Sequence, residues 1–267
     1  MVRWAFRSLE AWAKQRGYRV SWAPPTLTAN PGAELAFDLE YVIAHLMLAS
    51  PSVFFVQIGA NDGISNDPLY KFVVRFGWEG ILLEPVPEAF ELLKSTYRGH
   101  PKLRLLDAAI SEQDGSRTIY TMRMDGAAFR KGHQFSSFRK ESLLAQTRWV
   151  PDIAERIEER EVRCISFDTL LKEANGREVD ILQIDTEGYD FAVLKMIDFS
   201  RLRPPIICYE HVLMSKAEQE ESARLLCGHG YRLTRDNLDT IAYRPRETLG
   251  FRSARPSPAR RSGLNAS

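Results

Sequence analysis

From position 53 onward, short apolar runs alternate with segments of helical periodicity, and no other feature of the sequence constrains the fold as strongly. Runs that are apolar at consecutive positions indicate strands buried on both faces, as in a parallel sheet covered by helices. Strands are expected at 53–58, 80–84, 103–108, 179–184, 205–210, 231–234 and 240–243. Helices are expected at 34–49, 68–76, 87–97, 167–174, 189–196 and 216–228. The sequence therefore predicts an α/β protein with a doubly wound, mostly parallel sheet of seven strands.

The regions outside this alternation define the expected domain organisation. The last two strands are joined by a short turn, so we expect them to form an antiparallel hairpin at one edge of the sheet. Residues 116–124 indicate one further strand, and residues 125–151 form an insertion of mixed character within a domain at 51–245. Residues 1–50 are expected to form a helical extension and linker, and residues 246–267 a disordered Arg-rich tail.

Charge and cysteine content exclude several classes of protein. Lys and Arg total 36 against 35 acids, and this balance argues against a nucleic-acid-binding surface. The three cysteines form no C-x-x-C pair of the kind found in zinc and redox sites. No apolar run approaches the length of about 18 residues that a membrane span requires, and the basic N-terminus lacks the apolar core of a signal peptide. We expect a cytoplasmic protein.

The basic, amphipathic N-terminus is expected either to dock on the domain or to make a peripheral membrane contact. Nothing in the sequence indicates an oligomeric state.

The loop after the first strand, "IGANDG", is the expected ligand-binding turn. Ligands bind outside the carboxyl ends of the strands in an open parallel sheet, and Gly59 and Gly63 permit a close backbone approach there. The loop lacks the G-x-G-x-x-G dinucleotide pattern. Asp62 would repel a pyrophosphate by on the order of several kcal/mol. An NAD site is therefore disfavoured, whereas S-adenosylmethionine, which carries a sulfonium and an ammonium but no phosphate, suits this loop.

An acid at the end of the second strand supports this choice. Glu84 follows Gly63 by 21 residues and occupies the position where related folds place an acid that binds the ribose hydroxyls. The alternative is a surface glutamate ahead of the helix expected from Pro87. Asp107 and Ala108, after the third strand, are expected to border the adenine.

Six segments together resemble the FkbM family of S-adenosylmethionine-dependent methyltransferases, and the likeness extends over 53–243. They are "FVQIGANDG", "ILLEPVPEAFELL", "DAAISEQDG", "ISFDTLL", "DILQIDTEGYDFAVLK" and "IICYEH". The resemblance implies a Rossmann-like class I methyltransferase fold and O-methylation of a hydroxyl on a sugar, glycan or glycosylated small molecule. By position it assigns cofactor binding to Gly59, Asn61, Asp62, Gly63 and Glu84. The commoner family loop has a small or apolar residue where Asp62 stands.

Methyl transfer to a hydroxyl requires alignment of the acceptor oxygen and removal of its proton. Titratable groups follow the fourth and fifth strands at Asp185, Glu187, Glu210 and His211. Because histidine titrates nearest neutrality, His211 is the expected base, oriented by Glu210 or Asp185. Glu187 either contacts the substrate or caps the helix that follows it. A further alternative is Mg²⁺ held among these acids, although their spacing matches no metal motif.

The insertion offers the expected substrate-binding residues. His133, Gln134, Ser136 and Ser137 lie between aromatic residues, a mixture suited to stacking on a sugar ring and bonding its hydroxyls. The alternative is that the insertion is only a lid loop over the cleft. Two rival functions also stay open: a nucleotide-dependent oxidoreductase on the same fold, and a non-catalytic scaffold recruited through its N-terminus.

Overall fold

Mostly apolar, buried strands build the middle of the central sheet. The computed structural model describes residues 38–50, 52–123, 135–148, 150–236 and 238–245. The sheet has the order β10-β11-β9-β8-β1-β2-β3, in which the five strands from β9 to β3 are parallel and β11 and β10 are antiparallel. Its strands are β1 (Phe54–Ile58), β2 (Glu79–Leu83), β3 (Leu103–Leu106), β8 (Ile181–Ile184), β9 (Ile206–Glu210), β10 (Arg232–Arg235) and β11 (Asp239–Tyr243). The predicted fold class and the edge hairpin are confirmed.

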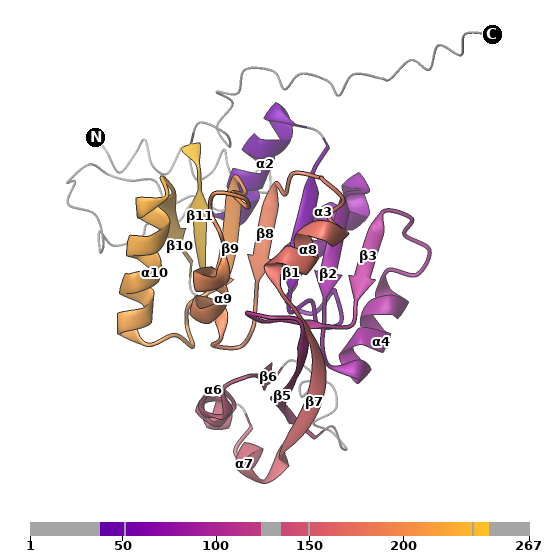
Figure 1. Cartoon of the computed structure of the whole chain (residues 1–267), viewed down its shortest axis with the longest axis vertical. Helices are drawn as coiled ribbons and strands as arrows, with labels where there is room; N and C mark the ends of the chain where they lie inside the picture. Colours follow the sequence, from indigo (N-terminus) through magenta and orange to yellow (C-terminus); the bar gives the residue numbers. More distant parts are fainter. Residues whose placement is uncertain (1–37, 51, 124–134, 149, 237, 246–267) are drawn as a thin grey trace, which may run out of the picture.

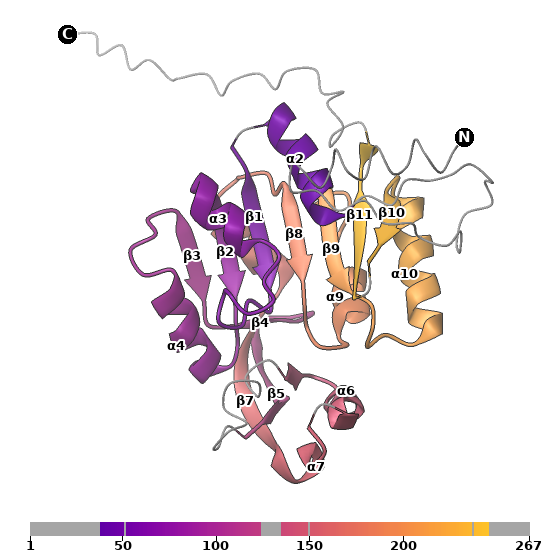
Figure 2. The same cartoon turned by 180° about the vertical axis from the view of Figure 1, so that it is seen from behind.

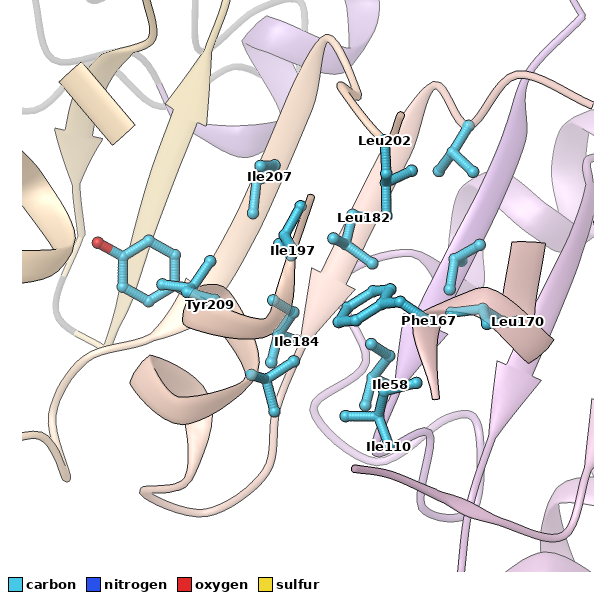
Figure 3. Close-up of a cluster of buried hydrophobic side chains, with 14 of the residues drawn as sticks. Ile58, Ile110, Phe167, Leu170, Leu182, Ile184, Ile197, Leu202, Ile207 and Tyr209 are labelled. Carbon is cyan, nitrogen blue, oxygen red and sulfur yellow. The ribbon is translucent and has the colours of Figure 1, made fainter. Parts of the chain in front are cut away.

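Helices cover both faces of this sheet, which explains why its central strands lack polar alternation (Figures 1 and 2). One face carries α2 (Leu39–Ala49), α3 (Tyr70–Phe76) and α4 (Pro87–Thr96), and the other carries α8 (Phe167–Glu173), α9 (Asp190–Met196) and α10 (Lys216–Gly228). Alternate residues of each strand enter different cores. Val56 and Ile58 of β1 join the core under α8 and α9, part of which Figure 3 shows, whereas Phe55 joins the core under α2 and α3.

The order of the strands fixes where a ligand can bind. The chain builds β1, β2 and β3 outward in one direction and then returns to place β8 on the other side of β1. The strand order therefore reverses between β1 and β8. A crevice forms at such a reversal, outside the carboxyl ends of the two strands.

A second sheet lies beyond these carboxyl ends (Figures 1 and 2). Its order is β4-β7-β5-β6, formed by β4 (Ala109–Ile110), β5 (Gly115–Met122), β6 (Ser136–Ser137) and β7 (Ile157–Ile165). Three short helices, α6 (Lys140–Leu144), η2 (Ala145–Arg148) and α7 (Ile153–Arg156), connect β6 to β7. The sequence predicted β5 but not β7. Because six of its nine residues are partly or fully exposed, the β7 segment "IEEREVRCI" lacks the apolar pattern by which the other strands were recognised.

Several expectations fall outside these residues. Residues 1–37 of the expected N-terminal extension, residues 125–134 of the insertion and the tail at 246–267 belong to the part of the chain that the structure does not describe. In the described part, no helix is long and apolar enough to cross a membrane. The cytoplasmic location stays a prediction.

Candidate active site

A cleft opens at the carboxyl ends of β1, β2, β8 and β9, where the strand order reverses. Its floor includes Gln57 and Gln183 from the strands, and its walls come from the loop after β1, the segment 108–110 after β3, and the loop after β8. Ser136, Ser137 and Phe138 close it from the side of the second sheet. Residues of both sheets therefore line the same cleft.

The two glycines of the first loop are required by crowding as well as by conformation. Gly59 has φ +81°, and a Cβ there would lie 1.8 Å from the backbone carbonyl oxygen of Asp185. Gly63 has φ +73°, and a Cβ would lie 2.6 Å from atoms of Leu93 and Tyr97. Both positions favour glycine over any residue with a side chain. The loops after β1 and β8 thus contact each other through backbone atoms.

Asp62 does not lie where the sequence argument placed it. Its carboxylate accepts hydrogen bonds from the backbone N–H groups of Ile64 and Ser65, at 3.0 and 2.7 Å, and from the hydroxyl of Ser65. The side chain is buried in its own loop and is not among the cleft-lining residues. Asp62 therefore shapes the turn, and the negative charge of the cleft comes from other acids.

Asp67 is the acid that this loop presents to the cleft. Its Oδ1 accepts hydrogen bonds from the N–H groups of Leu69 and Tyr70 at the start of α3, whereas its Oδ2 is buried and has no hydrogen-bond partner among the residues that the structure describes. Burial raises the pKa of Asp67 to about 6. Sequence reasoning missed this residue because "SNDPLY" reads as an ordinary turn before a helix.

Glu84 lies at the position that the sequence predicted for a ribose ligand. It follows β2, lines the cleft, and is only 4% exposed. Its two oxygens accept hydrogen bonds from the backbone N–H groups of Asn61 and Val86, at 2.8 and 2.9 Å, so the carboxylate is held rigidly. Burial, and then the charges of Asp185 and Asp107, raise its pKa to about 7. Ala108 lines the cleft, whereas Asp107 is exposed and does not.

Three of the four acidic or basic groups predicted after β8 and β9 do meet in the cleft: Asp185, Glu187 and Glu210. Asp185 is open to the cleft, but the protein around its carboxylate and the charge of Asp67 raise its pKa to about 6. Burial and neighbouring acids raise the pKa of Glu210 to about 10. The pKa of Glu187 is also raised, by burial and by Asp185.

Glu187 does not cap the following helix. It stands in the left-handed region at φ +50°, and its carboxylate accepts a hydrogen bond from the amide of Gln146 at 3.3 Å. The N–H group of Gly188 bonds instead to the carboxylate of Asp190. Asp190 is completely buried behind the cleft, and burial followed by the charge of Asp185 raises its pKa to about 8.

His211 is, with Asp62, Gly63 and Asp107, a predicted site residue that does not line the cleft. Its Nδ1 lies 3.2 Å from the hydroxyl of Thr240, and its side chain is not among those that line the cleft. Burial, together with the charge of Arg235, lowers the pKa of His211. Glu210 ends β9 facing the cleft, and the next residue points elsewhere, as alternation along a strand requires.

The cleft is strongly acidic. The charged side chains among its described lining residues are Asp67, Glu84, Asp185, Glu187, Glu210 and Asp239, and no lysine, arginine or histidine lines it there. Within the described residues, no group of three or more His, Cys, Asp or Glu side chains is arranged to hold a metal ion. The structure therefore gives no support to the Mg²⁺ alternative.

Polar and aromatic groups from the second sheet form the outer wall. Ser136 and Ser137 line the cleft as predicted for substrate contacts, and Phe138 packs edge-on against Tyr189 at a centroid distance of 5.1 Å. Arg117 lies over the Phe138 ring, 4.2 Å from its centroid. His133 and Gln134, also predicted here, lie outside the described residues.

Comparisons with known proteins identify a family. Residues 57–233 match the family described as the methyltransferase FkbM domain. The structure is similar to a crystal structure of a methyltransferase FkbM from Methylobacillus flagellatus, with 11% identity and a TM-score of 0.45 over 77% of this chain and 50% of that one. It is also similar to the N-terminal domain of human METTL16 in complex with SAH, with 12% identity and a TM-score of 0.42 over 89% and 80% of the two chains. The chain thus spans half the length of the first of these structures. No curated protein matches the sequence.

Proposed function

The chain belongs to the FkbM methyltransferase family, and from that premise we propose that it uses S-adenosylmethionine to methylate a hydroxyl of a sugar, glycan or glycosylated small molecule. The observation that carries the choice of donor is the charge of the cleft. Its described lining contains six acids and no basic side chain. A phosphorylated cofactor would be repelled there, whereas a positively charged one would be attracted.

The residues on the β1, β2 and β3 side of the cleft suit this donor. Glu84 is fixed by two backbone N–H groups and offers its remaining lone pairs to the ribose hydroxyls. Ala108 and Ile110 supply an apolar wall for the adenine. Asp67 Oδ2 and Gln57 Oε1 are buried acceptors without partners in the described structure, and both belong to the cleft. When bound, S-adenosylmethionine supplies a methyl group on a positively charged sulfur.

Asp185 is the residue best suited to accept the proton of the acceptor hydroxyl. It lies at the carboxyl end of β8, next to the strand-order reversal, and its carboxylate is open to the cleft. With a pKa of about 6, Asp185 is largely ionised at neutral pH, whereas Glu210, with a pKa of about 10, is largely protonated. A general base is most effective when its pKa lies near the working pH.

Titration calorimetry with S-adenosylmethionine and with NAD tests the choice of donor. We expect binding of S-adenosylmethionine only, and a preference for NAD would support the oxidoreductase alternative and refute this one. Transfer of labelled methyl groups from S-adenosylmethionine to fractionated saccharides then tests the reaction.

The role of Asp185 is tested with Asp185→Asn, and Glu221→Gln on the exposed surface of α10 is the matched control. Removal of a general base lowers turnover by about 10²- to 10⁴-fold, whereas the control should match the wild type. Turnover of the Asp185→Asn variant within a few-fold of the wild type would exclude it as the base.

A further inference from the structure

Two acids face each other at the end of the cleft farthest from Glu84. Glu210 ends β9, Asp239 begins β11, and the two residues are register partners in this antiparallel pair. Register partners project from the same face of a sheet, with Cβ atoms about 5 Å apart, and like charges at such positions are destabilising. Both side chains line the cleft. The pair therefore requires either a shared proton or a cation.

The described lining of the cleft supplies no such cation, and further acceptors lie nearby without donors. Glu210 Oε2 is buried and has no hydrogen-bond partner among the described residues. Gln183 Oε1 likewise has no partner in this part of the chain, and its side chain is 2% exposed and lines the same cleft. Gln183 is the register partner of Cys208, two residues before Glu210, so Gln183 and Glu210 project from the same face. Three side chains with acceptor oxygens converge here.

This group lies on the acceptor side of the proposed site. The strands run in the order β2, β1, β8, β9 and β11, so Glu84 and Glu210 are separated by three strand spacings, or about 14 Å. If the donor is anchored at Glu84 and at the apolar wall after β3, the end of the cleft at β9 and β11 is left for the molecule that receives the methyl group.

We propose that this molecule is an amino sugar, whose ammonium group binds between Glu210 and Asp239 and donates a third hydrogen bond to Gln183 Oε1. The inference rests on the proposed function, because it assigns the acceptor of the same reaction. An ammonium has three donors and favours the ionised form of neighbouring carboxylates. The sugar ring would then face the wall formed by Phe138 and Tyr189, which suits stacking on a saccharide. Asp185 would accept the proton of a ring hydroxyl, whose oxygen would receive the methyl group as its bond to the donor sulfur breaks and leaves a neutral thioether.

Three sugars that differ at one carbon test the charge requirement. Glucosamine, N-acetylglucosamine and glucose carry an ammonium, an acetamide and a hydroxyl at that position. Calorimetry with and without S-adenosylhomocysteine should show glucosamine binding at least about tenfold more tightly than either neutral sugar, as a charge-assisted hydrogen bond implies. Ethanolamine carries an amine and a hydroxyl without a ring, and it should bind more weakly than glucosamine. Equal affinity for the three sugars, no binding of glucosamine, or equal affinity for ethanolamine overturns the proposal.

Variants of the same side-chain shape test whether Glu210 and Asp239 cause the preference for glucosamine. Glu210→Gln and Asp239→Asn should each lower the affinity for glucosamine to that for glucose, while Glu221→Gln, on the exposed surface of α10, should leave it unchanged. Melting temperatures close to that of the wild type show that the variants fold, since each change keeps the shape of the side chain and buries no new charge. A preference for glucosamine that survives both changes overturns the assignment.

Failure of this inference is distinguishable from failure of the proposed function. If S-adenosylmethionine binds and a neutral saccharide hydroxyl is methylated in preference to an amino sugar, only the inference fails. If S-adenosylmethionine does not bind, the proposed function fails, whatever the sugars do.

Discussion

Replacing Gly59 by alanine tests the contact that joins the two ligand-binding loops. The backbone at Gly59 is left-handed, with φ +81°, and its new Cβ would lie 1.8 Å from the carbonyl oxygen of Asp185. Cβ atoms essentially never come within 3.0 Å of another heavy atom in this way, so one loop must move by more than 1 Å. Gly99 is the matched control, because it has φ +79° and a Cβ added there would have nothing within 4 Å.

Both alanine variants carry the strain of a left-handed backbone, but only Gly59→Ala also has a steric clash between its Cβ and Asp185. A left-handed alanine costs about 1–2 kcal/mol, and the lower entropy of the unfolded chain offsets up to about 1 kcal/mol of it. Gly99→Ala should therefore lose about 1 kcal/mol of unfolding free energy. Gly59→Ala has in addition an overpacking term of about 1–3 kcal/mol, for a total loss of about 2–4 kcal/mol. In a chain of this size each kcal/mol lowers the melting temperature by about 2–4 °C.

Urea denaturation followed by circular dichroism measures these losses, and calorimetry with S-adenosylmethionine measures their effect on the site. We expect Gly59→Ala to lose more stability than Gly99→Ala and to bind the donor at least about tenfold more weakly, with donor binding by Gly99→Ala unchanged. Equal loss of stability in the two variants, or wild-type donor affinity in Gly59→Ala, would show that the close approach of the loops does not constrain the site.

Three further predictions address the charged groups. Glu84→Gln should weaken donor binding by about tenfold or more in calorimetry, because an amide cannot accept hydrogen bonds from both Asn61 and Val86 through two oxygens; unchanged affinity would remove Glu84 from the site. His211→Gln should retain turnover within about twofold in a methyl-transfer assay, because the ring contacts Thr240 outside the lining; a hundredfold loss would restore histidine as the base. Stability should fall as pH rises from 5 to 8, because Asp190, with a folded pKa of about 8, keeps a proton that the unfolded chain has released above its usual pKa of 3.8. Urea denaturation at each pH should show a slope of about −1.4 kcal/mol per pH unit from such a group, reduced in Asp190→Asn; stability that rises over this range would contradict the assignment.

The sequence predicted the central sheet because burial on both faces leaves a strong signal. The boundaries of its strands agree with the structure to within a few residues, since the central runs are mostly apolar and end at a glycine or a charged residue. The second sheet gave a weaker signal. Most positions of β7 between Ile157 and Ile165 are polar or charged, because the strand pairs with β5 in a ribbon that is exposed over much of its length. Such a strand is stabilised by pairing with its neighbour, and its own sequence does not predict a strand.

The site was predictable where an acid interrupts an apolar run. Glu84 and Asp185 each follow a buried strand, Glu210 is the last residue of one, and all three line the cleft. Asp239 was missed because its place opposite Glu210 depends on the register of β9 and β11, which a single sequence does not specify. Asp62 was assigned to the ligand because an acid in a glycine loop looks exposed, although Ser65 three residues later was the available signal of a carboxylate that bonds back to its own loop.

Asp185 connects the two ends of the cleft, and this position explains why so many acids are tolerated together. Its backbone meets Gly59 of the first loop. Burial raises the pKa of Glu84 on one side and of Glu210 and Asp239 on the other, and the charge of Asp185 raises all three further. Without a ligand, several of these groups hold protons near neutral pH, which limits their repulsion. A positively charged ligand lowers the pKa of every carboxylate near it, so it makes Asp185 more fully ionised. The protein therefore forms its proposed base most completely when the positively charged donor is in place.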